Sequence, residues 1–495
     1  MIKILEKDHL FLIYFVVFGL VGLINNPIVS GIFGFALIII GAIDVIRNEN
    51  KSGEAHLYML ILGVFELYIR MNASIAPHEI SKYSIIFFSC LGLFFSRNRR
   101  QPNSLGFIFI ILFLPSLVVV DTSYKLWSRG IFFNLLGPIG LGTLLIYFYN
   151  YQINSIDIRN ICRAIVLPSS SAITFIQTNS ISIQDIEEVN FTVSNAELSG
   201  NFGGNQVSVM MGIIAGILLY CIFFNIKIFK YKILDYSLLG ICIFRGLLTF
   251  SRGGITVPFV AFALVTIISF IRIRNLKAFR KGFAVIFGAL FFYLFFLLVN
   301  SLTGSALERR YAGETGVTEK TGERDYLSGR DQIFIIDLEI FADHFLIGTG
   351  PGMARPLRYY YGFSNSVSAH IEFTRVLAEH GLLGLFALLI YIYLIFSKRH
   401  EWKQSPNETF FIFFTWWTSF LNSNHNAFRL GLTVFFLGFI VSKVKINPKY
   451  FTKDTRKKLP QDWANYLEER ARALDPNNAE SDPSKKLEQM ATLPR

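Results

Sequence analysis

Most of the residues that could perform chemistry lie in one polar segment, residues 301–381, which interrupts a chain otherwise made of hydrophobic runs. Its basic side chains are arginines with one lysine as the exception, and His370 stands near the start of a predicted helix. A guanidinium group is planar and permanently charged, and it can bind a diphosphate through two parallel hydrogen bonds. The positive end of a helix dipole disfavours imidazolium, so a neutral His370 could accept a proton there. The segment therefore predicts anion binding combined with proton transfer, although a structural role is commoner for any single histidine.

The composition indicates that these residues belong to a membrane protein. Of 495 residues, 52% are hydrophobic, 16% aromatic and only 17% charged, which is too apolar for a soluble protein. The hydrophobic runs are continuous and approach the length needed to cross a hydrocarbon core about 30 Å thick, so they predict helices. We therefore expect an all-α polytopic integral membrane protein with about 14 transmembrane helices, at Leu10–Ile24, Ile28–Ile46, Ala55–Ile69, Tyr83–Phe95, Leu105–Val120, Phe132–Tyr147, Ile161–Ile176, Val207–Phe224, Ile233–Phe250, Ile255–Ile271, Phe283–Val299, Leu382–Phe396, Phe410–Leu421 and Leu430–Val441.

Positively charged connections predict the orientation, because loops rich in Lys and Arg stay in the cytoplasm. The alternation of these loops places both termini inside, and it requires Ile161–Ile176 to be a span although it contains Arg163 and Pro168. The net charge of +12 is explained by cytoplasmic loops and a tail that face anionic lipid, so we expect no nucleic-acid partner. The basic clusters are Lys3 and Lys7, Arg47 and Lys51, Arg97 to Arg100, Lys227 to Lys232, Arg272 to Lys281, and Lys398 to Lys403.

The pattern divides the chain into four regions. They are transmembrane helices 1–11 in residues 1–300, a large extracytoplasmic loop in residues 301–381, transmembrane helices 12–14 in residues 382–444, and a cytoplasmic tail in residues 445–495.

Two helices are expected within the extracytoplasmic loop. The first, Asp331–Phe345, is amphipathic: its phenylalanines share a face that would rest on lipid or on the spans, while its acidic residues, among them Asp337, lie elsewhere. The second is short, carries His370 and ends at Gly381. The glycine-rich turn between them, Gly348–Gly352, lacks the Lys followed by Ser or Thr of a nucleotide-binding P-loop.

Charged residues at predicted spans are costly there, so each should be functional or ion-paired. Arg252 lies in Ser251-Arg252-Gly253-Gly254 at the outer membrane surface, where two glycines permit a close backbone approach, and this setting favours a functional role. Arg245 fits an ion pair with a neighbouring helix equally well. Glu66 and Arg70 stand four residues apart on one helix and predict a structural salt bridge.

No metal or cofactor site is predicted. The four cysteines fall in or beside spans, which argues against both a disulfide framework and a thiolate metal site. No Asp-x-Asp pattern occurs on the expected outer side. The first hydrophobic run lacks a small-residue cleavage site and is expected to be an anchor.

Four local features together resemble the O-antigen ligase and polymerase superfamily of bacterial surface-polysaccharide assembly. They are Ser251-Arg252-Gly253-Gly254 at the opening of a span, Ser328-Gly329-Arg330 before the amphipathic helix, the Gly348–Gly352 turn after it, and His370 followed by Gly381 and Gly384. Each motif is weak alone, and their order, spacing and predicted sidedness make the set more specific. The resemblance covers mainly Ile233–Phe396, about a third of the chain.

This resemblance implies a metal-independent, cofactor-free glycosyltransferase in the bacterial cytoplasmic (inner) membrane, with an undecaprenyl-diphosphate-linked glycan as donor. Because the diphosphate is already a good leaving group, the protein would hold its charge and activate an acceptor hydroxyl. We expect Arg252, Arg330 and Arg375 to bind the diphosphate, and His370 to orient or deprotonate the hydroxyl. Four other arginines are reserve candidates for the diphosphate: Arg309, Arg310, Arg355 and Arg358.

Two enzymatic hypotheses and one hypothesis of another class remain open. A polymerase joins lipid-linked repeat units of O-antigen or exopolysaccharide, whereas a ligase transfers the finished polymer to a lipid A core. Ligases of the superfamily usually carry Asn, Ser or Gln after the histidine, and Ile371 at this position favours the polymerase. The third hypothesis is a lipid-linked glycan flippase. The expected partners are the lipid-linked oligosaccharide, membrane lipid, and a chain-length regulator or a flippase.

Overall fold

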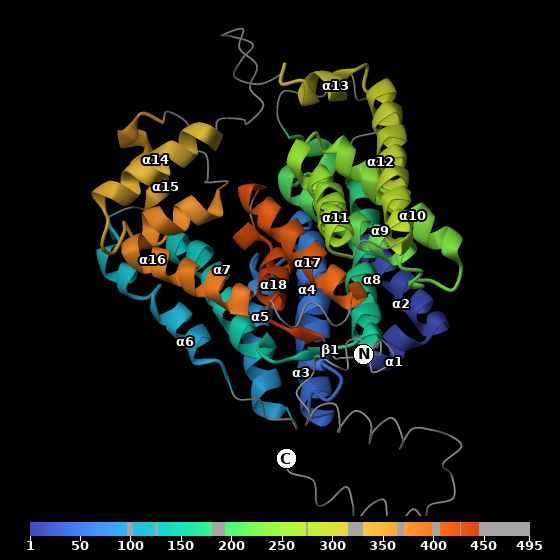
Figure 1. The fold of residues 1–495 in the computed structure, drawn as a ribbon, viewed down its shortest axis with the longest axis horizontal. Coiled ribbons are helices and arrows are strands. Elements are labelled where there is room, and N and C mark those ends of the chain that lie inside the picture. The colour runs from blue at the N-terminus through green and yellow to red at the C-terminus, as the bar shows by residue number, and fades with distance from the viewer. Residues whose placement is uncertain are drawn as a thin grey trace, which may run out of the picture.

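Hydrophobic helices from the whole length of the chain lie side by side in the computed structural model (Figure 1). The structure describes residues 1–96, 102–123, 127–180, 194–273, 276–314, 330–363, 371–397, 406–425 and 427–444. In the first half of the chain the helices are α1 (Ile2–Glu6), α2 (Asp8–Gly22), α3 (Pro27–Arg47), α4 (Glu54–Met71), α5 (Ile80–Phe95), α6 (Ser104–Ile111), α7 (Trp127–Phe148), α8 (Ser155–Asn179) and α9 (Gly204–Phe223).

The second half of the chain continues the bundle. Its helices are α10 (Lys232–Leu248), α11 (Arg252–Ile273), α12 (Leu276–Leu302), α13 (Ala306–Tyr311), α14 (Arg330–Asp343), α15 (Ala354–Leu357), α16 (Glu372–Ser397), α17 (Pro406–Leu421) and α18 (Gly431–Phe439). Short 3-10 turns join several of them: η1 (Pro115–Val119), η3 (Glu197–Ser199), η5 (Arg358–Tyr361), η7 (Asn422–His425) and η8 (Ala427–Arg429). Two short strands, β1 (Gln152–Ile153) and β2 (Lys443–Val444), pair in parallel.

The core of the bundle is built around α4, in which every residue is buried. Helices at the periphery instead expose large apolar side chains, such as Ile39 on α3 and Ile286 on α12. An apolar surface of this kind requires lipid around it. Six stretches of the described residues, in α3, α7, η3–α9, α11, α12 and α16, are long and apolar enough to cross a membrane. The structure thus agrees with the predicted all-α membrane protein, while the count of about 14 spans stays a prediction.

Helix α8 shows how a charged residue is accommodated within the bundle. It spans Ser155–Asn179 and so includes the predicted span that contained Arg163. Arg163 is buried, donates to the Leu5 carbonyl (2.6 Å) and pairs with Asp8 (2.6 Å). Because both Nη atoms have partners, the guanidinium group can be tolerated where an unpaired charge would be very costly.

Two predicted spans differ from the structure. The run Leu105–Val120 is divided: α6 ends at Ile111 and η1 starts at Pro115, whose missing N–H cannot continue a helix. The run Leu430–Val441 contains only the nine-residue α18, which is about 14 Å long at 1.5 Å per residue. A helix of that length reaches less than halfway across a bilayer core of about 30 Å.

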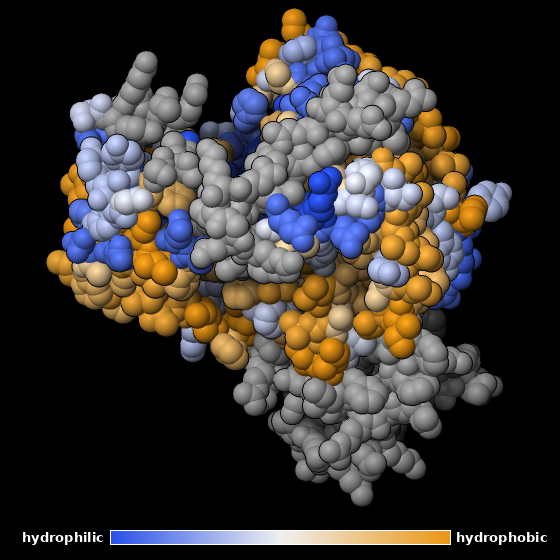
Figure 2. Space-filling model, turned by 90° about the horizontal axis from the view of Figure 1, so that it is seen from above, coloured by the Kyte–Doolittle hydropathy of each residue, from blue (hydrophilic) through white to orange (hydrophobic). Residues whose placement is uncertain are grey.

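The two ends of the bundle are distinguished by their polar contacts. At the end that we call the terminal end, the Met1 ammonium group binds Asp44 (2.9 Å) and β1 pairs with β2. The opposite end, which we call the loop end, carries α13 and α14 (Figure 1). Viewed onto the loop end, the coloured hydrophilic residues form patches in the middle of the face and at parts of its margin, with apolar residues between them (Figure 2).

Two of the predicted basic connections lie wholly within the described residues, and both are at the terminal end. Arg47 is close enough to Asp44 to affect its titration, and Asp44 binds Met1. The Lys227 carbonyl accepts a hydrogen bond from Arg163, which also binds Leu5. These connections and the N-terminus therefore share one side of the bundle, as the alternation predicts, and the compartment that this side faces stays a prediction.

Close packing between α9 and α11 generates a first prediction. A Cβ atom on Gly212 would lie 2.4 Å from the Gly254 carbonyl oxygen, whereas one on Gly63 of α4 would lie 3.6 Å from its nearest neighbour. Gly212→Ala should therefore lower the midpoint of thermal unfolding in detergent, at a cost of about 1–3 kcal/mol. Gly63→Ala should leave the midpoint unchanged or raise it, because alanine is the better helix former. Equal midpoints for the two variants would show that α9 and α11 are not packed this closely.

Candidate functional site

Arg70 is the centre of a buried polar network at the loop end. It pairs with Glu66 and with Glu79 (3.2 Å), so the predicted salt bridge is confirmed and is part of a larger cluster. Arg70 also donates to the Gln206 side-chain oxygen of α9 (2.7 Å) and to the Arg429 carbonyl of η8 (3.0 Å). The network therefore joins the ends of three elements that are far apart in the sequence.

Glu66 extends this network to the start of α18. Its carboxylate accepts from the Ser81 hydroxyl and, over 3.4 Å, from the Gly431 amide. Lys82 of α5 is also buried, and it pairs with Glu79. The positive charge of Lys82 is therefore neutralised, like that of Arg70. Buried charges are stable only when paired and hydrogen-bonded, so these contacts fix the helix ends relative to one another.

Arg375 lies inside a cage of acceptors on α16 and α7. Its guanidinium group binds Glu372, Glu379 (2.8 Å) and the Asn134 side-chain oxygen (2.8 Å). These bonds use the Nε hydrogen, both Nη1 hydrogens and one Nη2 hydrogen of the five that a guanidinium carries. A diphosphate at this arginine would use the remaining Nη2 hydrogen or displace a carboxylate.

Arg358 is buried, although it was expected to be a surface arginine. It binds Asp337 through Nε (2.8 Å) and Nη2 (2.7 Å), and Asp337 also accepts from Thr374 (3.0 Å). Burial raises the pKa of Asp337, and the Arg358 guanidinium opposes that shift. The pattern predicts Asp337 away from the phenylalanine face of its helix, and the structure buries it there. The pair ties η5, α14 and α16 together.

Arg252 and Arg310 lie together at the junction of α10 and α11. Arg310 donates to the Phe250 carbonyl (3.4 Å), which brings α13 back onto this junction. Burial raises the pKa of Tyr311, and the positive charges of Arg252 and Arg310 oppose that shift. Both guanidinium groups are therefore near the same phenol. Arg309, the next residue on α13, is exposed.

Arg429 is a residue of this region that the sequence reasoning missed. Burial lowers its pKa to about 10, and the nearby carboxylate of Glu372 opposes that shift. The guanidinium groups of Arg375, Arg355 and Arg70 lie close enough to favour its neutral form as well. An arginine beside the last hydrophobic run was the available signal, since the same argument singled out Arg252.

Four of the predicted arginines, together with Arg429, thus fall into two neighbouring groups, bridged by the first turn of α9. One group holds Arg252 and Arg310, and the other holds Arg355, Arg375 and Arg429. Gln206 of α9 binds Arg70 beside the second group, and Gly204 lies against the Thr249 carbonyl beside the first.

Two further predicted residues lie at the margins of the described chain. Arg330 begins α14. His370 lies outside the described residues, as do Ser328 and Gly329; its neighbour Ile371 accepts the backbone N–H of Arg375 (3.3 Å).

The Gly348–Gly352 turn is docked onto α16. Thr349 and Gly350 donate their backbone N–H groups to the Ala378 and Glu379 carbonyls (3.1 and 2.9 Å). All three glycines of the turn have positive φ, and a Cβ on Gly348 would lie 2.4 Å from the Glu379 backbone. Glycine is needed here for the conformation and for the close approach. His380 is buried against Phe113 and bonds Ser116 (2.6 Å), so it has a structural role here.

A cavity of about 570 Å³ opens on the other side of this turn. It lies between the α6–α7 connection and residues 344–360, and its wall is formed by Val119, Asp121, Ser123, His344, Gly348, Thr349, Met353, Pro356, Leu357 and Tyr360. Its size is in the usual range for ligand sites, about 300–1,000 Å³.

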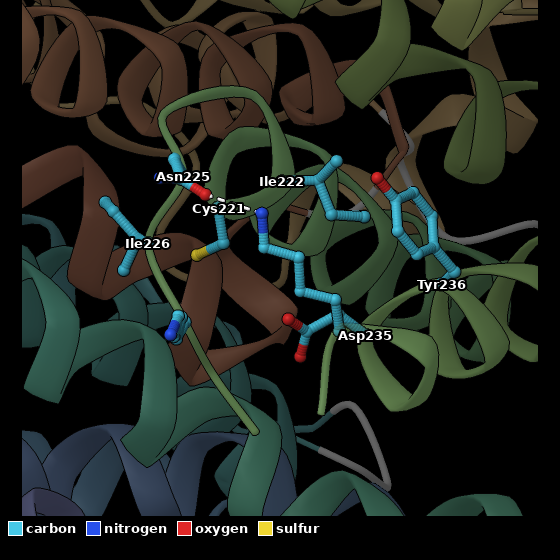
Figure 3. Close-up of a pocket in the computed structure, with 8 residues that line it drawn as sticks. Cys221, Ile222, Asn225, Ile226, Asp235 and Tyr236 are labelled. Carbon is cyan, nitrogen blue, oxygen red and sulfur yellow. Dashed lines mark hydrogen bonds between the residues drawn. The ribbon is translucent and has the colours of Figure 1, made fainter. Parts of the chain in front are cut away.

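A second pocket, at the terminal end, has too little free space for a substrate. Figure 3 shows its lining, in which the Lys232 ammonium group donates to the Asn225 side-chain oxygen (2.8 Å). The free space is about 20 Å³, enough for one water molecule. Among the described residues, no group of three or more His, Cys, Asp or Glu side chains is placed to hold a metal ion.

Residues 237–389 match the model of the O-antigen ligase family. This segment begins in α10 and ends in α16, so it contains Arg252, α13, the glycine turn and Arg375. Comparisons with curated proteins and with solved structures give no match. The family match covers about a third of the chain, and over residues 237–389 it confirms the resemblance to the O-antigen ligase and polymerase superfamily that the motifs predict.

Proposed function

We propose that the protein is a membrane glycosyltransferase that polymerises O-antigen or exopolysaccharide repeat units from an undecaprenyl-diphosphate-linked donor. The observation that best supports this proposal is the gathering of arginines at the loop end, most of them within the segment that matches the family. Guanidinium groups held in place before the substrate arrives can stabilise a leaving diphosphate without reorganising.

The proposed reaction is a displacement at the anomeric carbon of the donor. The oxygen of an acceptor hydroxyl forms a new bond to the anomeric carbon. At the same time, the bond between the anomeric carbon and the phosphate oxygen breaks. The undecaprenyl diphosphate leaves with the electron pair, and the hydroxyl proton passes to a base, for which His370 is our candidate. No metal is needed in this scheme, since the arginines supply the positive charge.

The arginines differ in the roles that we assign to them. Arg252, Arg330 and Arg375 would bind the diphosphate, with Arg310 and Arg429 beside them. Arg309 and Arg355 are exposed and would meet the ligand at the edge of the site. Arg358 would act through position, since its pair with Asp337 holds η5 and α14 against α16.

A polymerase is preferred to a ligase because of Ile371, which stands where ligases of the superfamily usually carry a polar residue. Both activities use the same donor and the same leaving group, and they differ in the acceptor. A flippase has less support, since the arginines gather at one end of the bundle instead of along a path through it.

His370→Ala, introduced into a strain that lacks the chromosomal copy, tests the function. We expect normal amounts of protein in the membrane but no polymer, so that the glycolipid carries a single repeat unit, as in the deletion strain. Electrophoresis of the extracted glycolipids measures this. Polymer stranded on undecaprenyl diphosphate beside uncapped core would instead identify a ligase. Wild-type polymer from the variant would remove His370 from the mechanism.

Arg252→Lys tests the need for a planar fork at the start of α11. The charge stays, but the paired hydrogen bonds to a diphosphate are lost, so kcat/KM should fall about tenfold to a hundredfold, or about 1.4–2.7 kcal/mol. The assay follows lipid-linked repeat units converted to polymer by purified protein. Arg47→Lys, an exposed position at the terminal end, is the matched control and should keep full activity. A variant at Arg252 as active as this control contradicts the assignment.

Labelling of single cysteines tests the proposed sidedness. With the exposed Cys90 replaced by Ala, Ser301→Cys at the loop end should react with a membrane-impermeant maleimide in intact spheroplasts. Lys51→Cys, at the terminal end, should react only after lysis, because the basic connections are expected in the cytoplasm. The reverse pattern would place the arginines in the cytoplasm and exclude an extracytoplasmic reaction.

A further inference from the structure

We propose that the cavity between the α6–α7 connection and residues 344–360 binds uncharged sugar residues of the acceptor glycan. This inference rests on the proposed function, because it assigns a place to the second substrate. The cavity has about 570 Å³ of space, and its two walls come from parts of the chain more than two hundred residues apart. One wall holds Asp121 and Ser123, and the other holds His344, Thr349 and Tyr360.

The lining suits hydroxyl groups and does not suit a diphosphate. Among the described residues, neither Arg nor Lys lines the cavity, and the Asp121 carboxylate would repel an anion. The Ser123 amide (2.9 Å) and hydroxyl (2.6 Å) both donate to one oxygen of Asp121, which orients the carboxylate. Its second oxygen can accept from sugar hydroxyls, while His344 and Thr349 supply further polar groups.

The three consecutive tyrosines of η5 have distinct positions. Tyr361 donates its hydroxyl to Asp343 (2.6 Å), and this bond raises the pKa of Tyr361 to about 12. Tyr359 and Tyr360 are both exposed, at 71% and 81%, and only Tyr360 lines the cavity. An exposed aromatic ring beside hydrogen-bonding groups is a surface on which the apolar face of a sugar can stack.

The cavity adjoins the proposed diphosphate site. Gly348 and Thr349 line the cavity, and the same turn bonds the backbone of α16 at Ala378 and Glu379. Glu379 in turn pairs with Arg375. Only the turn and one ion pair therefore separate an acceptor in the cavity from an arginine proposed to bind the donor.

The surroundings of the cavity fit an acceptor that is itself attached to lipid. Val118, next to the lining residue Val119, is 87% exposed, and Leu346, close to the lining residue His344, is 68% exposed. Apolar side chains exposed in this way are expected at the membrane surface. A glycan whose lipid remains in the bilayer would present its sugars at that level.

Binding of two probes to the purified full-length protein in nanodiscs tests the inference. The first probe is the repeat-unit glycan, isolated from a deletion strain and released from its lipid by mild acid. The second is inorganic pyrophosphate. Tyr360→Ala and Asp121→Asn should each weaken glycan binding about tenfold, as expected for the loss of one stacking or charged contact. Both variants should bind pyrophosphate as the wild type does, because neither Tyr360 nor Asp121 carries the positive charge that a pyrophosphate needs.

Tyr359→Ala is the matched control, because it removes a neighbouring exposed ring that does not line the cavity. It should bind the glycan with wild-type affinity. Glycan binding that is unchanged in Tyr360→Ala and Asp121→Asn, or that falls equally in Tyr359→Ala, would overturn the inference, as would a wild-type protein that binds no glycan. These outcomes leave the proposed function in place if the wild type still forms polymer. Absence of transfer would overturn that function separately.

Discussion

The buried contacts of Arg70 are the constraint on which the loop end depends. A guanidinium group that is removed from water must find acceptors for its donors, and Arg70 finds them in α4, at Glu79 just before α5, in α9 and in η8. Removing one partner of such a pair would cost about 3–5 kcal/mol, because the other charge would remain buried. The helix ends cannot separate without that cost, so this end of the bundle should be held more firmly than apolar packing alone would hold it.

The need of a buried guanidinium group for acceptors also fixes the orientation of arginines that are proposed to bind the donor. Arg375 is already surrounded by Glu372, Glu379 and Asn134, which fix its orientation before any ligand arrives. A fixed guanidinium loses little side-chain entropy on binding, but its carboxylates compete with an incoming diphosphate. Selectivity follows from this competition, since a doubly charged group could displace a carboxylate where a neutral sugar could not.

Local patterns predicted the parts of the fold that depend on neighbours along the chain. The helix through Arg163, the Glu66–Arg70 pair and the break of α16 at Gly381, where the backbone is non-helical, could all be inferred from spacing and residue type. Patterns failed where the partner is remote in sequence. Asp337 was expected on a polar face because nothing in its own helix shows that Arg358 will bury it. Arg429 was missed because only the fold places its guanidinium group close to those of Arg355 and Arg375.

The hydrophobic run Ala55–Ile69 predicted the helix at the centre of the bundle, but a stricter test that limits the number of charged residues passes over it. Helix α4 is buried along its whole length, yet it is not among the six stretches that satisfy a length and hydropathy test, because it contains Glu54, Glu66 and Arg70. A helix surrounded by other helices can carry charges that a lipid-facing helix cannot, provided that its neighbours supply partners. The sequence signal of a central helix is therefore weaker than that of a peripheral one, although the central helix organises more of the structure.

The glycine turn connects these packing rules to the proposed chemistry. Its backbone lies so close to α16 that no side chain fits at Gly348, and positive φ at three positions allows this approach. One face of the turn lines the cavity, and the other contacts the helix that carries Arg375. If donor and acceptor bind as proposed, their separation is fixed by a hydrogen-bonded backbone and does not depend on the length of either lipid or glycan. A site of that kind can accept a growing polymer, since only the sugars next to the reacting bond need to meet the protein.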